Sequence, residues 1–161
     1  MEYTELMRGF AVRFGVADLD TGNGAAALEI DGLSVGFIHD AETDELMVVA
    51  EIGFPPPDAD GPFGSMMLKA NYLYNGTDGA IICQNPGTGA YAVMRSYPLA
   101  QLDVETFVQA AEALINTAER WKDILSGASL AEDAKAERDA EFPEPEGGSR
   151  FAGAFGGFLQ V

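Results

Sequence analysis

Two apolar stretches joined by Asp31-Gly32 constrain the fold of this chain more than any other feature. Both positions of a tight two-residue hairpin turn need a positive φ angle, which aspartate and glycine tolerate well. Residues 26–30 before the turn and 33–38 after it therefore predict two neighbouring antiparallel strands. The alternating residues 46–52 predict a third strand. The prolines at 55–57 end its pairing, because proline has no N–H to donate.

The spacing of apolar residues predicts helices in three further segments. Residues 4–16 repeat apolar side chains at three- and four-residue steps, which places them on one face. A second helix is expected at 62–74, with Asn75-Gly76 as its left-handed stop. A third begins at Asp103, a good capping residue, and runs to Leu125. Its apolar stripe consists of Phe107, Ala111, Leu114, Ala118, Trp121 and Leu125.

Two more strands complete the pattern, at residues 80–84 and 91–97, on either side of a turn-forming stretch at 85–89. The order is helix, three strands, helix, two strands, helix. This order predicts an α+β fold in which three helices pack on an antiparallel five-stranded sheet. We expect one domain at residues 1–125, followed at 126–161 by an acidic linker and an apolar tail.

Charge excludes several classes of partner. The chain carries 26 acidic and 9 basic residues, a formal net charge of −17. Such a charge repels nucleic acid and anionic membrane surfaces. No apolar run reaches the roughly 18 residues of a membrane span, and the acidic N-terminus is unlike a signal peptide. With a single cysteine, Cys83, no intrachain disulfide can form, so a cytoplasmic protein is expected.

The second predicted helix is apolar on more than one side. A helix of this kind must be covered on several sides, and in a small domain a second subunit is the natural cover. Burial within its own chain is the alternative. We therefore predict a homodimer. Its candidate interface residues are Phe63, Met66, Met67, Ala70, Leu73 and Tyr74.

The order of motifs over residues 1–125 resembles the class I type III secretion chaperones, the CesT or Tir-chaperone family. No single motif is specific, but their sequence and spacing together are. The motifs are Asp44–Gly53 followed by prolines, Met66–Asn71 with its Ala-Asn pair, Gly79–Ile82, Tyr97–Asp103, and a closing helix that carries Trp121.

The resemblance implies a homodimer that binds an extended segment of an effector protein on apolar patches near the first helix and the sheet. It implies that the second helix builds the dimer contact and that no nucleotide, metal or other cofactor is used. The candidate partner-binding residues are Phe10, Phe14, Val35 and Phe37, although the same side chains could be core. The expected function is to keep an export substrate soluble and export-competent. The alternative is a regulatory or stress protein of the same fold without a dedicated effector.

Nothing in the sequence predicts an enzyme. The one histidine, His39, is expected to be exposed in a turn, and Cys83 to be an inert buried thiol. Zinc would need a cluster of Cys and His that is missing from the sequence. Residues 18–29 have acidic residues at calcium-loop spacing, but residues 25–30 are predicted to be a strand where the exiting helix should be. We therefore expect no catalytic residue and no metal.

The C-terminal segment 151–161 is apolar and rich in glycine, behind the acidic linker 141–148. We expect it to pack on apolar surface through Phe151, Phe155, Phe158 and Leu159. One hypothesis is that it occupies the effector groove when no effector is bound. The alternatives are a lattice contact, a fixed part of the dimer, or a mobile tail.

Overall fold

The structure, a computed structural model, describes residues 2–16, 19–54 and 60–127. The chain divides into a unit of residues 1–129, which contains all of these residues, and a second unit of residues 130–161. The predicted tail and Asp18 lie outside the described residues. The elements are α1 (Tyr3–Arg13), β1 (Ala25–Ile30), β2 (Leu33–Asp40), β3 (Glu45–Gly53), α2 (Asp60–Asn71), β4 (Ile81–Gln84), β5 (Tyr91–Pro98) and α3 (Val104–Leu125), with short 3-10 turns at Gly22–Gly24, Tyr72–Tyr74 and Leu99–Gln101.

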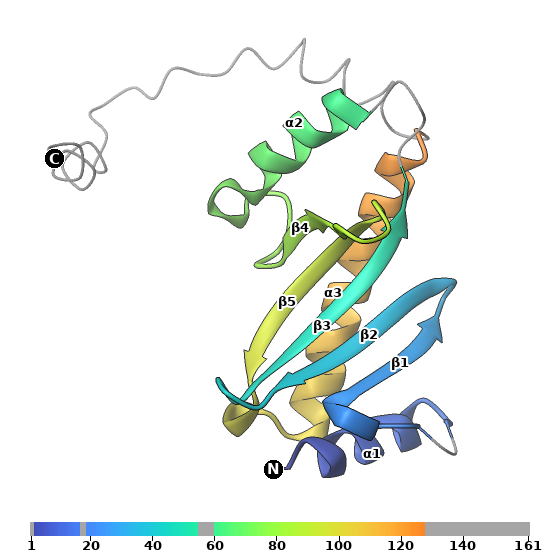
Figure 1. The fold of residues 1–161 in the computed structure, drawn as a ribbon, viewed down its shortest axis with the longest axis vertical. Helices are drawn as coiled ribbons and strands as arrows, with labels where there is room; N and C mark the ends of the chain where they lie inside the picture. Colours follow the sequence, from blue (N-terminus) through green and yellow to red (C-terminus); the bar gives the residue numbers. More distant parts are fainter. Residues whose placement is uncertain (1, 17–18, 55–59, 128–161) are drawn as a thin grey trace, which may run out of the picture. The chain divides into compact units, whose positions relative to one another are not determined.

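The predicted fold class is confirmed. The five strands form one antiparallel sheet in the order β1-β2-β3-β5-β4 (Figure 1). The β1–β2 turn has the left-handed conformation that its sequence predicts, with φ angles of 50° at Asp31 and 73° at Gly32. Ile30 pairs with Leu33 directly beside that turn. This register points Leu33, Val35 and Phe37 to one side of the sheet, where all three are buried.

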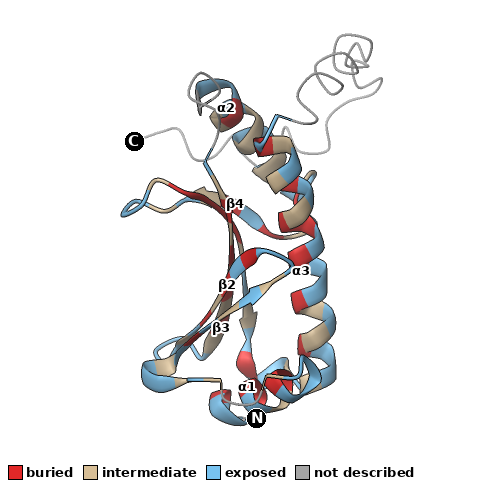
Figure 2. Cartoon of the chain, turned by 90° about the vertical axis from the view of Figure 1, so that its right-hand side faces the viewer, coloured by how far each residue is buried: buried red, intermediate tan, exposed pale blue. Residues whose placement is uncertain are grey.

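The core lies between the sheet and α3. Helix α3 runs along one face of the sheet, and α1 packs against its N-terminal half (Figures 1 and 2). Three phenylalanines from three elements meet there: the ring centroid of Phe10 lies 5.1 Å from that of Phe37 and 4.9 Å from that of Phe107. Such aromatic clusters bury large apolar areas and favour tilted or edge-on rings. The predicted stripe of α3 is confirmed, since all six of its residues are buried.

The start of α3 is also confirmed. The carboxylate of Asp103 accepts a hydrogen bond of 2.8 Å from the backbone N–H of Thr106, and the Thr106 hydroxyl accepts one of 3.0 Å from the N–H of Asp103. These reciprocal bonds satisfy two backbone donors that the helix itself leaves open. The bond from the Thr106 N–H is also the main reason that the pKa of Asp103 is lowered.

The end of α2 differs from the prediction. The helix ends at Asn71, and the left-handed residues are Leu73 and Tyr74, with φ of 53° and 56°. The physical reason is tertiary. The Asn71 side chain accepts from the N–H of Ile82 and donates to its carbonyl oxygen, both at 2.9 Å, and so ties the helix end to β4. Gly76 is used for close approach, because a Cβ there would lie 3.0 Å from that of Ala70.

His39 also differs from the prediction. It lies within β2, partly buried, and not in an exposed turn. The alternation of β2 explains this, because His39 follows Val35 and Phe37 on the inward face. Its ring stacks on Tyr3 at 5.3 Å, and its Nε2 lies 3.2 Å from the Asp44 carboxylate. None of the helices in the described part of the chain is long and apolar enough to cross a membrane.

Candidate partner-binding surfaces

Helix α1 ends earlier than predicted, at Arg13, because Gly15 turns the chain back. Gly15 has a φ angle of 69°, which a residue with a side chain adopts less readily. The N–H of Gly15 donates to the carbonyl of Val12, and that of Val16 to the carbonyl of Ala11 at 2.9 Å. These two bonds form a Schellman motif, a common way to end a helix. The motif turns the chain back, so that Val16 lies near Ala11 and Val12 of α1.

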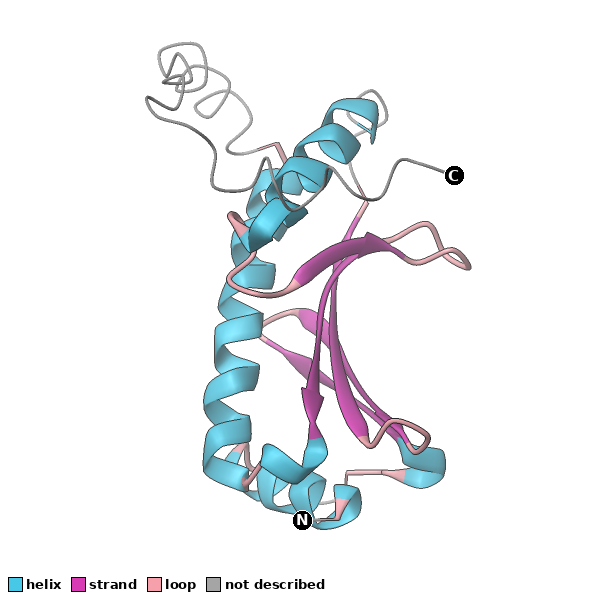
Figure 3. Ribbon diagram, turned by 90° about the vertical axis from the view of Figure 1, so that its left-hand side faces the viewer, coloured by secondary structure: helices cyan, strands magenta, loops and turns pink. Residues whose placement is uncertain are grey.

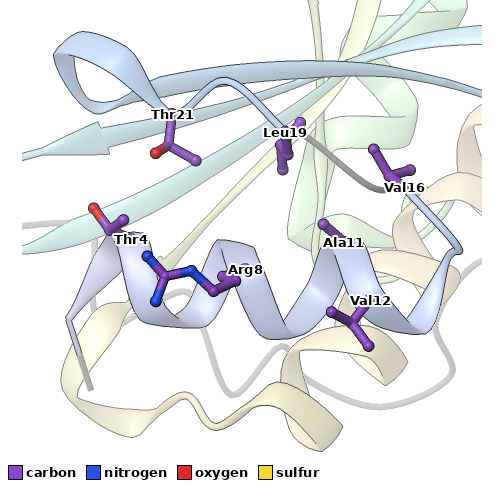
Figure 4. Close-up of a pocket in the computed structure, with 7 residues that line it drawn as sticks. All are labelled: Thr4, Arg8, Ala11, Val12, Val16, Leu19 and Thr21. Atoms are coloured by element: carbon purple, nitrogen blue, oxygen red, sulfur yellow. The ribbon is translucent and has the colours of Figure 1, made fainter.

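This return builds a groove between α1 and the segment that leads into β1. The groove has a volume of about 170 Å³ and is lined by Thr4, Arg8, Ala11, Val12, Val16, Leu19 and Thr21 (Figure 4). The guanidinium group of Arg8 extends toward the end that Thr4 and Thr21 line, whereas Ala11, Val16 and Leu19 face one another at the opposite end. Val12 is 72% exposed. The groove is smaller than a typical pocket for a whole ligand, and its size suits one or two side chains of a bound segment.

The four predicted partner-binding residues do not share one environment. Phe10, Val35 and Phe37 are completely buried in the core described above. Phe14, one turn after Phe10, is 36% exposed and packs its ring 4.6 Å from that of Phe10. Of these four, Phe14 is therefore the side chain that a partner can touch without opening the core. Contact between a partner and these residues stays a prediction.

A second apolar surface lies at the end of α2. Leu68, Tyr72 and Leu73 are 69%, 73% and 71% exposed, and Tyr74 is exposed beside them. Among the predicted interface residues, Phe63 is instead buried against Tyr91 and Trp121, at centroid distances of 4.8 and 5.9 Å. Met66, Met67 and Ala70 are partly buried against the core. We call Leu68, Tyr72, Leu73 and Tyr74 the α2 patch.

The sheet face opposite α3 carries no helix of the described chain (Figure 3). Its central row runs across the strands in register: Gly36 pairs with Val49, Val49 with Met94, and Met94 with Ile81. Ile38 and Met47 pair in the next row. This face is therefore apolar at its centre and partly open to solvent. Its strands are held by their backbone bonds and by burial of their other face.

The described residues contain no group of three or more Cys, His, Asp or Glu side chains placed to hold a metal ion. Asp20, from the calcium-like spacing, accepts a hydrogen bond of 2.9 Å from the N–H of Gly22. Glu29 lies in strand β1, as expected from the sequence. Cys83 is partly buried, and this burial raises the pKa of its thiol, so less reactive thiolate forms near neutral pH.

These surfaces belong to a framework that a family model recognises. Residues 5–122 match the model of the Tir chaperone protein (CesT) family. The chain belongs to the Tir chaperone protein (CesT) family. The family resemblance seen in the sequence is thus confirmed, and the CesT match runs from the first turn of α1 to the last turn of α3.

Solved structures share the fold of this CesT-family chain. One is from the HopA1–SchA chaperone–effector complex, with 19% identity and a TM-score of 0.62 over 75% of this chain and 93% of that one. Another is from the ExsC–ExsE complex, with 24% identity and a TM-score of 0.62 over 76% and 92%. A third is from the Yersinia pestis type III secretion chaperone SycH with a fragment of YscM2, with 16% identity and a TM-score of 0.59 over 74% and 98%. Among curated protein sequences, none matches the chain.

The sequence predicted neither the groove nor the full α2 patch. Gly15 followed by Val16 is the signal that could have located the groove, since glycine with an apolar residue after it is typical of a Schellman end. The exposure of Leu68 and Tyr72 had no such signal, because the helix is apolar around most of its circumference.

Proposed function

We propose that the protein binds an extended, unfolded segment of a type III secretion effector in the cytoplasm and keeps that effector soluble and export-competent. The observation that carries the proposal is the family match over residues 5–122. The chaperone–effector complex among its structural neighbours supports the same class of partner. The function is binding without chemistry, so no catalytic residue or cofactor takes part.

The groove beside α1 is the proposed docking site. Its apolar end and the adjacent Phe14 offer side-chain contacts, while the outer edge of β1 lacks a neighbouring strand in the described sheet. An extended segment can therefore bind through side chains in the groove, through strand addition at this edge, or through both. Either mode leaves the folded remainder of the partner free.

The α2 patch is the proposed dimer contact. Leu68, Tyr72 and Leu73 are each more than two-thirds exposed in the single chain, and clustered exposed apolar side chains mark interaction sites. Aromatic residues are common at the centres of such interfaces. The proposal retains Leu73 and Tyr74 from the sequence-based prediction and adds Leu68 and Tyr72. A regulatory or stress protein of the same fold is not favoured, because the matching family is one of chaperones.

Co-purification from the native cell, followed by mass spectrometry, tests the proposal. The captured protein must be secreted, must aggregate on its own as measured by light scattering, and must stay soluble with an equal amount of this protein.

Val12→Asp should reduce capture, because it places a charge in the groove. Gln109→Asp, at an exposed position on α3, is the matched control. If Val12→Asp and wild type protect the partner equally, the groove is not the docking site.

A further inference from the structure

Basic side chains are scarce in this chain. Those that form hydrogen bonds or ion pairs with other described residues stabilise loops and turns of the fold. Of the nine lysines and arginines, Lys135, Arg138 and Arg150 lie outside the described residues, which leaves six. Arg95 and Arg120 hold the loop before β4: Arg95 donates to the Asp78 carbonyl at 3.1 Å, and Arg120 lies 3.0 Å from the Asp78 carboxylate. Lys122 donates to a backbone carbonyl in the β1–β2 turn at 2.9 Å.

Arg8, Arg13 and Lys69 have no ion pair or side-chain hydrogen bond with any other described residue, and of these three Arg8 is the one that lines the groove. Its guanidinium group extends into the polar end of the groove beside Thr4 and Thr21 (Figure 4). A cation here adds nothing to solubility in a chain of net charge −17, since it lowers the size of that charge. Its fork of donors is suited to a carboxylate, which it can bind through two parallel hydrogen bonds.

We propose that the groove selects partner segments that place an acidic side chain on Arg8 and an aliphatic side chain at the opposite, apolar end. This inference rests on the proposed function and names the kind of segment that the same site accepts. The polar end supplies Arg8 and two threonine hydroxyl groups, and the apolar end supplies alanine, valine and leucine side chains. The site therefore distinguishes one end of a bound segment from the other.

The spacing along α1 sets a minimum spacing in the partner. Arg8 and Val12 are separated by one helical turn, about 6 Å along the helix axis at about 1.5 Å per residue. In an extended segment, side chains two residues apart point to the same side and lie about 6.6 Å apart. Because the Arg8 guanidinium extends away from the apolar end, an acidic residue two or more positions from a valine, leucine or isoleucine, on the same side of the segment, fits the groove. Neighbouring residues in the segment would point to opposite sides.

Synthetic peptides test this selection in the full-length protein. The probes are short threonine- and serine-rich peptides that contain Glu-Thr-Val or Val-Thr-Glu, matched peptides with Gln in place of Glu, and a peptide with Glu and Val adjacent. Affinity is measured by fluorescence anisotropy at low salt, and the binding site by amide chemical shifts. We expect at least one of the two Glu peptides to bind about fivefold more tightly than its Gln counterpart, equivalent to about 1 kcal/mol. The adjacent arrangement should lose this advantage.

Arg8→Gln should abolish the preference for Glu while the protein remains folded, because Arg8 is exposed and unpaired among the described residues. Arg13→Gln, on the same helix but outside the groove, is the matched control and should keep the preference. A preference that persists in Arg8→Gln, no difference between Glu and Gln peptides, or amide shifts away from the groove would each overturn the inference. The proposed chaperone function has its own test, since a co-purified effector that binds without acid preference would leave that function standing.

Discussion

Two aromatic-rich regions of this molecule differ in their exposure to solvent. The cluster of Phe10, Phe37 and Phe107 is completely buried between α1, the sheet and α3. The α2 patch is similarly apolar, yet its side chains remain more than half exposed. Because both regions are rich in apolar side chains, hydrophobicity alone does not explain why one is buried and the other exposed. The first region therefore stabilises the folded chain, whereas the second leaves its apolar side chains open to solvent.

The backbone reflects the same division. Residues of the buried cluster lie in regular helix and strand, and none of them has a positive φ angle. In the α2 patch, Leu73 and Tyr74 both adopt the left-handed conformation, which costs a residue with a side chain about 1–2 kcal/mol. Strain of this kind persists where the surroundings enforce it, and it is common at functional sites. The Asn71 bonds to Ile82 supply that constraint on one side.

The largest expected effect is on the buried region. Phe10→Ala should lower the free energy of unfolding by about 3–5 kcal/mol, because it leaves a cavity in a close-packed core. Phe14→Ala, four residues later but partly exposed, should cost about 1 kcal/mol. Urea denaturation measures both.

Phe14→Ser should instead weaken partner binding more than folding, and equal losses of binding and stability would make Phe14 an ordinary core residue.

The next effect is on assembly. Leu68→Glu together with Leu73→Glu should weaken the proposed dimer by at least about 2 kcal/mol, because charged groups would be buried at its centre. The variant should run as a folded monomer in analytical ultracentrifugation, with an unchanged circular dichroism spectrum. Glu105→Gln and Glu112→Gln, at exposed positions on α3, form a charge-changing control. A wild-type protein that is already monomeric at micromolar concentration would contradict the comparison between the two regions.

A smaller and more specific effect comes from the strain itself. Leu73→Gly should raise the free energy of unfolding of the monomer by about 1 kcal/mol, because glycine adopts positive φ without a steric penalty. The same substitution should weaken the dimer, since it removes an exposed leucine side chain from the patch. Leu68→Ala is the control: it should weaken the dimer without stabilising the monomer. If Leu73→Gly destabilises the monomer, the leucine is held by packing that outweighs its strain.

Local chemistry explains which parts of the fold could be predicted. The Asp31-Gly32 turn, the Asp103 cap and the stripe on α3 each depend on residues close together in sequence, and the structure confirms all three. The left-handed end of α2 could not be read in this way. Its conformation depends on hydrogen bonds from Asn71 to Ile82, which are eleven positions apart. Sequence favoured Asn75-Gly76, but Gly76 serves close approach to Ala70 instead.

The candidate site shows the same limit. Phe10 and Phe14 share one face of α1, and periodicity cannot tell which of them lies under α3 and which lies at its margin. The groove needs the Gly15 turn, which is local, and the placement of Leu19 and Thr21 above α1, which is not. The position of the Arg8 guanidinium group in the groove, and its lack of a described partner, become visible only in the folded chain.

The smallest expected effect concerns whether the exposed surfaces stay open in the full chain. Residues 149–161 lie outside the described residues, so their occupancy of the groove stays a prediction. Burying a large apolar side chain contributes about 1.5–3 kcal/mol, and ordering each residue costs about 1–2 kcal/mol. With five large apolar side chains among the eleven residues 151–161, these quantities nearly cancel. A tail that is docked about half of the time would reduce partner affinity about twofold.

Truncation after Gly148 should therefore tighten binding of the Glu-Thr-Val peptide about twofold while leaving the dimer unchanged. Unchanged peptide affinity, together with sharp NMR resonances that report a mobile tail in the full chain, would rule out competition by the tail. A weakened dimer after truncation would instead place the tail in the interface.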